Sequence, residues 1–188
     1  ALVVIGSTVY AGGAFTSVNG IARNRLAALD GVTGTLLSWN PNANAAVHCL
    51  VAHEDSLVVG GQFTNIGGQV RNRIARLDAA TGAPLVWNPN SNGLVNVMVR
   101  SGDQLYIGGG FTNVGGVNRN RAAVLDLTTG TAGTWNPNAN GAVHAIVHDG
   151  ATVYLGGEFT GLGIWSRSYL AAVSASTGGV QPWNPGAD

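Results

Sequence analysis

Arginine and asparagine side chains recur in this sequence in fixed columns beside aromatic residues. An Arg-Asn-Arg triplet occurs three times, and a related Arg-Ser-Tyr segment occurs once. Guanidinium and amide groups next to aromatic rings suit sugar hydroxyls, carboxylates or a peptide, because they combine directed hydrogen-bonding groups with an apolar surface. We therefore take the following as candidate ligand-binding residues: Arg23, Asn24, Arg25, Arg71, Asn72, Arg73, Arg119, Asn120, Arg121, Arg167 and Tyr169.

Trp165 joins these candidates because it breaks the regular spacing of the other tryptophans. An exposed indole close to Tyr169 suits stacking against a sugar ring or contact with a protein partner. The alternative is that Trp165 covers an end repeat whose neighbour differs. Both interpretations remain open at the level of the sequence.

An architectural role is the alternative for the Arg and Asn columns. Asparagine in a turn caps backbone groups and tolerates left-handed conformations. The arginines would then bind a carbonyl group or the aspartate of a following turn. A triplet in almost every repeat favours architecture, since a single central site needs no copy per repeat. A lectin with one site per repeat is the exception.

Other chemistry lacks the residues that it would need. No Ser-His-Asp set, pair of carboxylates or phosphate-binding loop is identifiable, so we expect no catalytic residues and no enzymatic activity. His48 and His144 share a column, but two histidines without a third ligand do not make a metal site. Cys49 is the only cysteine, which excludes a disulfide framework. We expect neither a metal nor another cofactor.

The composition narrows the classes of partner. Charged residues make up 10% of the chain and the formal net charge is zero, against about 25% charged residues in an average soluble domain. Neither nucleic acid nor an anionic membrane is attracted by such a surface, and no apolar run is long enough for membrane insertion. Low charge with abundant Gly, Asn and Thr favours a secreted or cell-surface location.

A repeat of 48 residues positions all these side chains. Phe15, Phe63, Phe111 and Phe159 recur at this period, and so do four tryptophans, Trp39, Trp87, Trp135 and Trp183. The period defines four repeats, at approximately residues 1–43, 44–91, 92–139 and 140–188, within one domain spanning 1–188. We expect the Phe and Trp columns to be buried within or between repeats.

The sequence of each repeat predicts four short strands. In the second repeat these are 47–52, 57–61, 73–78 and 84–87, with a loop over 63–69. Strands of this length separated by turns indicate an all-β fold, and four antiparallel strands per unit indicate a β-propeller blade. A Gly-Gly pair ends the second strand, where glycine permits a bulge or a close backbone approach. An Asp-x-x-Thr-Gly turn follows the third strand in three repeats.

The pattern hhhGGxFTxxGGxxRNRLAxLDxxTGxxxxWNPN resembles the delta-60 type of bacterial β-propeller repeat, with kelch-like blades. The resemblance covers the whole chain and implies a secreted or surface-attached scaffold without catalytic residues. The segment Ala28-Leu29-Asp30 to Trp39 is also similar to the tryptophan-docking motif of quinoprotein dehydrogenases. Those enzymes use an adjacent cysteine pair and an acidic calcium site, which this sequence lacks.

The leading hypothesis is therefore a non-catalytic, exported or cell-surface β-propeller that binds a glycan or a surface protein. The alternative is a structural repeat unit of an extracellular assembly, and a quinoprotein-like enzyme comes third. Self-association is a further expectation. Four blades in one ring, two copies in an eight-blade ring and a section of a longer array remain open.

Overall fold

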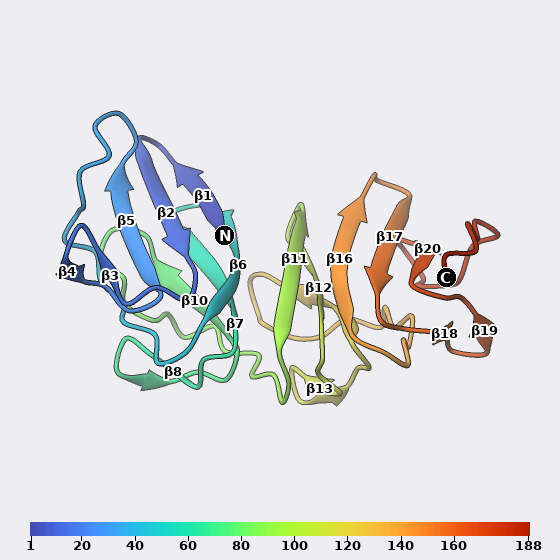
Figure 1. Ribbon diagram of the computed structural model, residues 1–188. Helices are drawn as coiled ribbons and strands as arrows, with labels where there is room; N and C mark the ends of the chain where they lie inside the picture. Colours follow the sequence, from blue (N-terminus) through green and yellow to red (C-terminus); the bar gives the residue numbers. More distant parts are fainter. The chain divides into compact units, whose positions relative to one another are not determined.

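The structure, a computed structural model, describes residues 1–188 and consists of short β-strands joined by turns, as Figure 1 shows. All of its helix or strand elements are strands, so the all-β prediction is confirmed. No helix is long and apolar enough to cross a membrane. The chain divides into two compact units, Ala1–Asn90 and Ser91–Asp188. Each unit contains two three-stranded antiparallel sheets and two two-stranded ones.

The sheets of both units have the same plan, with the second strand of each repeat in the middle. In unit 1 the orders are β1-β2-β5 and β10-β7-β6, and in unit 2 they are β11-β12-β15 and β16-β17-β20. The unit 1 strands are β1 (Leu2–Ile5), β2 (Thr8–Gly12), β5 (Leu26–Asp30), β6 (Val47–His53), β7 (Ser56–Gly61) and β10 (Ile74–Asp78). The unit 2 strands are β11 (Val95–Ser101), β12 (Gln104–Gly109), β15 (Ala122–Asp126), β16 (Val143–His148), β17 (Thr152–Gly157) and β20 (Leu170–Ser174).

A two-stranded hairpin stands in each repeat where the sequence predicted only a loop. It precedes the third strand and is followed by the Arg-Asn-Arg triplet, or by Arg-Ser-Tyr in the fourth repeat. The hairpin strands are β3 (Ser17–Val18), β4 (Ile21–Ala22), β8 (Asn65–Ile66), β9 (Gln69–Val70), β13 (Asn113–Val114), β14 (Val117–Asn118), β18 (Gly161–Leu162) and β19 (Trp165–Ser166). Glycines with positive φ, such as Gly67 and Gly68, form the tight turn between them.

The predicted fourth strand is wrong as a full strand, so the sheets are three-stranded. The segment at 84–87 pairs with its sheet only through the isolated bridge between Leu77 and Pro84. Leu85 N–H donates to the Arg76 carbonyl at 2.8 Å. Corresponding bridges, Leu29–Leu36, Leu125–Ala132 and Val173–Val180, show that the other repeats share this arrangement.

The Gly-Gly pairs have the predicted role. The pairing of β6 with β7 shifts by one residue between Val47 and Cys49, opposite Gly61 and Gly60. A Cβ atom on Gly61 would overlap the Ala46 carbonyl oxygen. The bulge therefore forces the neighbouring backbone so close that only glycine fits.

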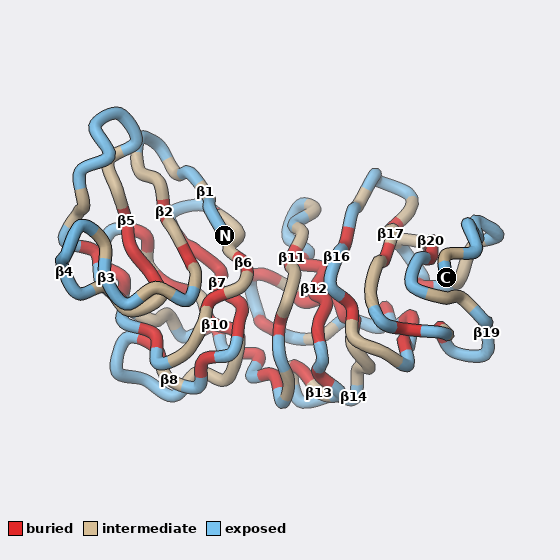
Figure 2. Tube along the Cα trace, viewed as in Figure 1, coloured by how far each residue is buried: buried red, intermediate tan, exposed pale blue.

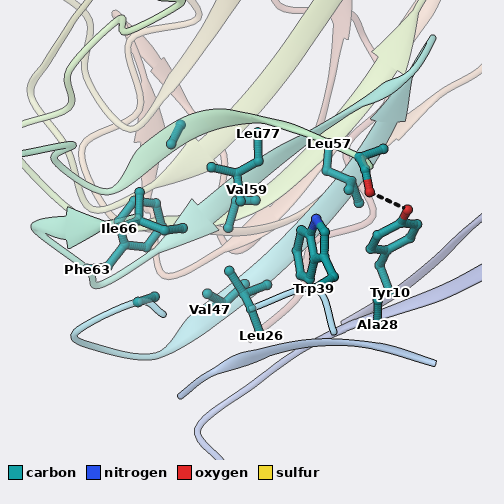
Figure 3. Packing of buried hydrophobic residues seen from close by; sticks show 13 residues of the cluster. Tyr10, Leu26, Ala28, Trp39, Val47, Leu57, Val59, Phe63, Ile66 and Leu77 are labelled. Carbon is teal, nitrogen blue, oxygen red and sulfur yellow. Dashed lines mark hydrogen bonds between the residues drawn. The ribbon is translucent and has the colours of Figure 1, made fainter. Parts of the chain in front are cut away.

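Aromatic residues join the two sheets of unit 1 (Figure 3). The Trp39 indole N–H donates to the Asp78 carbonyl at 3.2 Å. The Tyr10 hydroxyl donates to the Ala79 carbonyl at 2.8 Å, the bond drawn as a dashed line in Figure 3. The two rings meet edge to face, with their centres 5.1 Å apart. Burial raises the pKa of Tyr10, so its hydroxyl keeps the proton that it donates.

Unit 2 repeats this contact at the equivalent positions. Trp135 donates to the Ser174 carbonyl at 2.9 Å, and Tyr106 donates to the Ala175 carbonyl at 3.1 Å. Their rings also meet edge to face, with centres 5.3 Å apart. The prediction that the Trp column packs between repeats is confirmed for Trp39 and Trp135, and the phenylalanines Phe63, Phe111 and Phe159 are fully buried.

The aspartate turns form as predicted. Asp78 accepts hydrogen bonds from the Thr81 hydroxyl and N–H, both at 2.7 Å, and from Ala80 N–H at 3.1 Å. Asp30 and Asp126 accept the same set. The Thr81 hydroxyl and N–H hold the pKa of Asp78 below its usual range, because they stabilise the charged form. Ser174 accepts one such bond, from Thr177 N–H at 3.3 Å.

These turns predict a loss of stability in acid. The pKa of each of the three aspartates is lowered in the fold. Their contribution is therefore complete above the unfolded value, about 3.9, and disappears as the pH falls through the lower folded values. We expect the urea midpoint of the wild-type protein to fall as the pH is lowered through that window. The midpoint of a triple Asp→Asn variant at positions 30, 78 and 126 should fall by less. Parallel pH profiles of the two proteins would contradict this assignment.

Candidate functional site

The first arginine of each triplet is bound into the framework. Arg23 Nη2 donates to the Leu37 carbonyl at 2.8 Å, and Nη1 donates to the Ala22 carbonyl at 2.9 Å. Arg71, Arg119 and Arg167 make the same two kinds of contact. The guanidinium groups thus tie the hairpin of a repeat to the segment that follows its third strand. These contacts use two or three of the five N–H donors of each guanidinium group, and the Nε atoms of Arg23, Arg71 and Arg167 are buried.

The asparagines of the triplets also bind within the protein. Asn24 Nδ2 donates to Asn42 Oδ1 at 2.7 Å, and Asn72 and Asn120 make the corresponding bonds to Asn90 and Asn138. These partners belong to the Trp-Asn-Pro-Asn segment and have positive φ angles. The bond therefore fixes a turn in the conformation that Asn tolerates best.

The second arginine position is fixed by its backbone. Arg25, Arg73, Arg121 and Tyr169 all have φ angles between 63° and 68°. The N–H of each donates to the carbonyl of the repeat's phenylalanine, as Tyr169 does to Phe159 at 2.8 Å. This positive φ angle fixes the main chain, whereas the residue type at this position differs between repeats. In the fourth repeat it presents a tyrosine, 42% of which is exposed.

Exposed apolar side chains lie in the hairpin of the fourth repeat and just after it. We call this set the repeat-four patch: Ile164 is 95% exposed, Trp165 54% and Tyr169 42%. The Arg167 guanidinium lies 6.0 Å from the Trp165 ring centre and is anchored by the carbonyls of Ser166 and Gln181. A cation held at this distance restrains the indole through a cation–π contact. The patch thus offers aromatic surface that is partly pre-positioned for stacking.

The histidines of the fourth repeat make separate contacts. His144 Nε2 lies 3.0 Å from Glu158 Oε1, and its Nδ1 lies 3.1 Å from Asn96 Nδ2. The ring of His148 packs on Tyr106, with centres 4.9 Å apart. A bulge between Val143 and Ala145 breaks the alternation that would place both histidines on one side of the strand. No group of three or more His, Cys, Asp or Glu side chains gathers in a metal-binding arrangement.

Cys49 lies buried in β6, and this burial raises the pKa of its thiol to about 12. The protonated form is therefore strongly favoured at neutral pH. Such a thiol is a poor nucleophile, so it adds no reactive group to the candidate sites.

A groove of about 520 Å³ opens in unit 2 near the Tyr106–Trp135 contact. Polar groups from Ser101, Gln104 and His148 line it. The sequence did not single out this groove, because its residues come from several separated segments. The available signal was that the repeats differ at these positions: His148, for example, corresponds to Ala52. Its mixture of polar and aromatic groups suits a small polar ligand.

A family model for a domain of unknown function, the DUF5122 beta-propeller, matches residues 55–84. These residues include β7, the hairpin β8–β9 and β10. No curated protein matches the chain.

Several solved structures share the fold. The computationally designed Ika8 protein is 16% identical with a TM-score of 0.62, and the match covers 95% of this chain and 46% of Ika8. The designed Ika4 protein is 18% identical with a TM-score of 0.62, and the match covers 88% of this chain and 88% of Ika4. The extracellular domain assigned to a one-component system of B. thetaiotaomicron is 16% identical with a TM-score of 0.60. That match covers 96% of this chain and 21% of the other chain. The chain thus spans less than half the length of Ika8. Together with the family model, the matches indicate a β-propeller type of fold.

Proposed function

We propose that this chain is a non-catalytic β-propeller module that binds carbohydrate outside the cell. Its four repeats are blades of the delta-60, kelch-like type, each with a fourth strand reduced to a bridge. The module needs neither a metal nor another cofactor, and it acts as a secreted or surface-attached protein. The patch on the fourth repeat is its binding surface.

The observation that carries the proposal is the exposure of Trp165 beside an anchored arginine. Its ring is 54% exposed, and the Arg167 guanidinium lies 6.0 Å away. An indole face supplies apolar contact for the C–H side of a sugar ring, and Tyr169 adds a second exposed ring with a hydroxyl group. The first arginine and the asparagine of each Arg-Asn-Arg triplet instead bind groups within their own repeat.

Two further findings support the extracellular location and an uncharged class of ligand. The neighbour from B. thetaiotaomicron with a similar fold is an extracellular domain. The sequence itself has few charged residues and no net charge, which favours uncharged ligands over nucleic acid or anionic membrane.

A structural unit of an extracellular assembly is the second candidate function. A specific observation favours it: Trp183, the last member of the buried Trp column, is 45% exposed. In an assembly, this aromatic side chain would serve as a contact surface.

Trp165→Ala is expected to abolish most carbohydrate binding without changing the fold. Binding would be screened on a glycan array, and affinity for the best oligosaccharide would be measured by titration calorimetry. We expect a loss of about tenfold or more, which corresponds to roughly 1.4 kcal/mol. The reason is that stacking on the indole disappears while the framework bonds remain.

Trp183→Ala is the matched control, since it also removes an exposed tryptophan of the fourth repeat but leaves the patch intact. It should retain the affinity of the wild-type protein. No binding on the array, or equal affinity of the Trp165→Ala and wild-type proteins, would contradict the proposal. Loss of binding in a Gln104→Ala variant instead would place the ligand in the groove of unit 2.

A further inference from the structure

The groove of unit 2 has a smaller counterpart in unit 1, at the equivalent place in the fold. It lies between the third and fourth repeats, and all its lining residues belong to unit 2. It opens beside Tyr106 on β12, a strand that is buried along most of its length (Figure 2). The counterpart lies beside Tyr10 and measures about 260 Å³, against about 520 Å³ in unit 2. Tyr10 and Tyr106 make the same sheet contact, so the residues that differ between the grooves are particular to unit 2.

One difference is a missing side chain. Gly133 lines the unit 2 groove where Leu37 lines the unit 1 groove, and the second repeat also has leucine there, Leu85. The main chain has the same role at both places. The Leu37 carbonyl accepts from Arg23 at 2.8 Å, and the Gly133 carbonyl accepts from Arg119 at 2.6 Å. The glycine therefore leaves open the space that a leucine side chain fills in unit 1.

Polar side chains are the second difference. They stand in the unit 2 groove at positions where unit 1 has apolar residues: Ser101, His148 and Ser176 correspond to Ile5, Ala52 and Ala80. The contact between the sheets does not need them, because Tyr10 and Trp39 make that contact in unit 1 without them. Their role therefore lies outside the framework that the two units share.

Two of the lining residues bring N–H donors to the groove. Gly150 N–H donates to His148 Nδ1 at 3.2 Å, so the neutral imidazole carries its proton on Nε2. The imidazole ring also packs on Tyr106, with centres 4.9 Å apart, which restrains its orientation. Gln104 Oε1 lies 3.3 Å from the Tyr106 hydroxyl and accepts from it. The Gln104 amide nitrogen thus keeps its two N–H groups for another acceptor.

The lining as a whole defines the class of ligand. No charged side chain lines the groove, so an ion would lose its hydration there without gaining a counter-charge. The hydroxyl groups of Ser101, Thr134 and Ser176 can each donate and accept, which suits a compact molecule with several hydroxyl groups. Sites for small molecules usually measure about 300–1,000 Å³. The groove of unit 2 lies within this range at about 520 Å³, and that of unit 1 lies below it at about 260 Å³.

We propose that the groove of unit 2 binds a small, uncharged polyhydroxy molecule, such as a free monosaccharide or a cyclic polyol. His148 Nε2–H and the Gln104 amide donate to hydroxyl oxygens of the ligand. The serine and threonine hydroxyls complete its hydrogen bonds, and Gly133 leaves the room that it occupies. Unit 1 does not bind it, because Leu37 fills that room. The site is separate from the repeat-four patch, and either site can bind without the other.

The test is an NMR titration of the intact, isotope-labelled chain with D-glucose, D-galactose and myo-inositol. Binding should shift the amide signals of Gly150 and Ser176 and leave the indole signal of Trp165 unchanged. Glucuronate and glucosamine, charged relatives of glucose, should bind more weakly. Shifts centred on the Trp165 indole would place the sugar on the repeat-four patch and overturn the proposal. Stronger binding of a charged sugar, or no shift at tens of millimolar of any probe, would overturn it as well.

Substitutions that copy unit 1 test the site itself. Gly133→Leu should abolish the binding, because it introduces the side chain of Leu37. A Cβ atom at Gly133 comes no closer than 3.7 Å to atoms beyond its chain neighbours, so the remaining NMR signals should stay in place. His148→Ala, which copies Ala52, should raise the Kd about fivefold through the loss of one hydrogen bond. Ser38→Ala, which removes a hydroxyl from the unit 1 groove, is the control and should bind like the wild-type protein. Unchanged affinity of a folded Gly133→Leu protein would overturn the proposal.

Discussion

Trp135→Ala is expected to lower the free energy of unfolding by about 3–5 kcal/mol, the usual cost of removing a large buried aromatic side chain. The indole is 4% exposed, packs edge to face on Tyr106 and donates to the Ser174 carbonyl at 2.9 Å. Its loss leaves a cavity between two sheets of unit 2, and the Ser174 carbonyl loses the indole donor. Urea unfolding followed by circular dichroism measures the change.

The matched control is Trp183→Ala at the same position of the fourth repeat. Because 45% of Trp183 is exposed, we expect it to cost about 1 kcal/mol or less. Both variants are compared at a concentration where the wild-type protein is monomeric, so that association does not contribute. Equal losses for the two tryptophans would show that the sheet contact does not stabilise the fold.

Gly109→Ala should lower the free energy of unfolding by about 3 kcal/mol, at the upper end of the usual cost of overpacking. An added Cβ atom would overlap the Leu94 carbonyl oxygen and lie 2.9 Å from its carbon. Both obstacles are backbone atoms of the paired strand, so they cannot move aside without breaking the bulge opposite Gly109. The urea midpoint again measures the effect.

Gly110→Ala is the control for this substitution, because a Cβ atom there meets nothing within 4 Å. We expect its stability to stay the same or to rise by up to about 1 kcal/mol, since alanine restricts the unfolded chain. A Gly109→Ala protein as stable as the Gly110→Ala protein would mean that the sheet accommodates the side chain. The requirement for glycine at the bulge would then be disproved.

Much of the local structure was predictable from the sequence, because it depends on residues close together in the chain. The 48-residue period, the first three strands of each repeat, the glycine pairs and the aspartate turns all follow from neighbouring residues. Asp78 and Thr81, for instance, lie in one turn, and their hydrogen bonds need no distant partner. The fourth strand was over-predicted because apolar character does not show that this segment pairs with its sheet only around Pro84.

The candidate site was predictable only in part. Whether an arginine binds a ligand or its own framework depends on the direction of its N–H groups, which the sequence does not give. Arg23 and Arg71 looked like ligand-binding groups, yet each donates to a carbonyl 14 residues further along the chain. Trp165 was recognisable because it broke the period, and the structure shows it exposed. The groove of unit 2 was missed because folding assembles it from separated segments of differing repeats.

The sequence alone determined the repeat and the local geometry of each unit, since these follow from side-chain volume, glycine freedom and turn chemistry. Only the tertiary structure decided which members of a repeated column are buried. Trp39, Trp135 and Trp183 occupy equivalent positions, but the first two are about 5% exposed and the third is 45% exposed. The physical reason is that burial depends on packing against a neighbouring repeat, which the residue type alone does not encode.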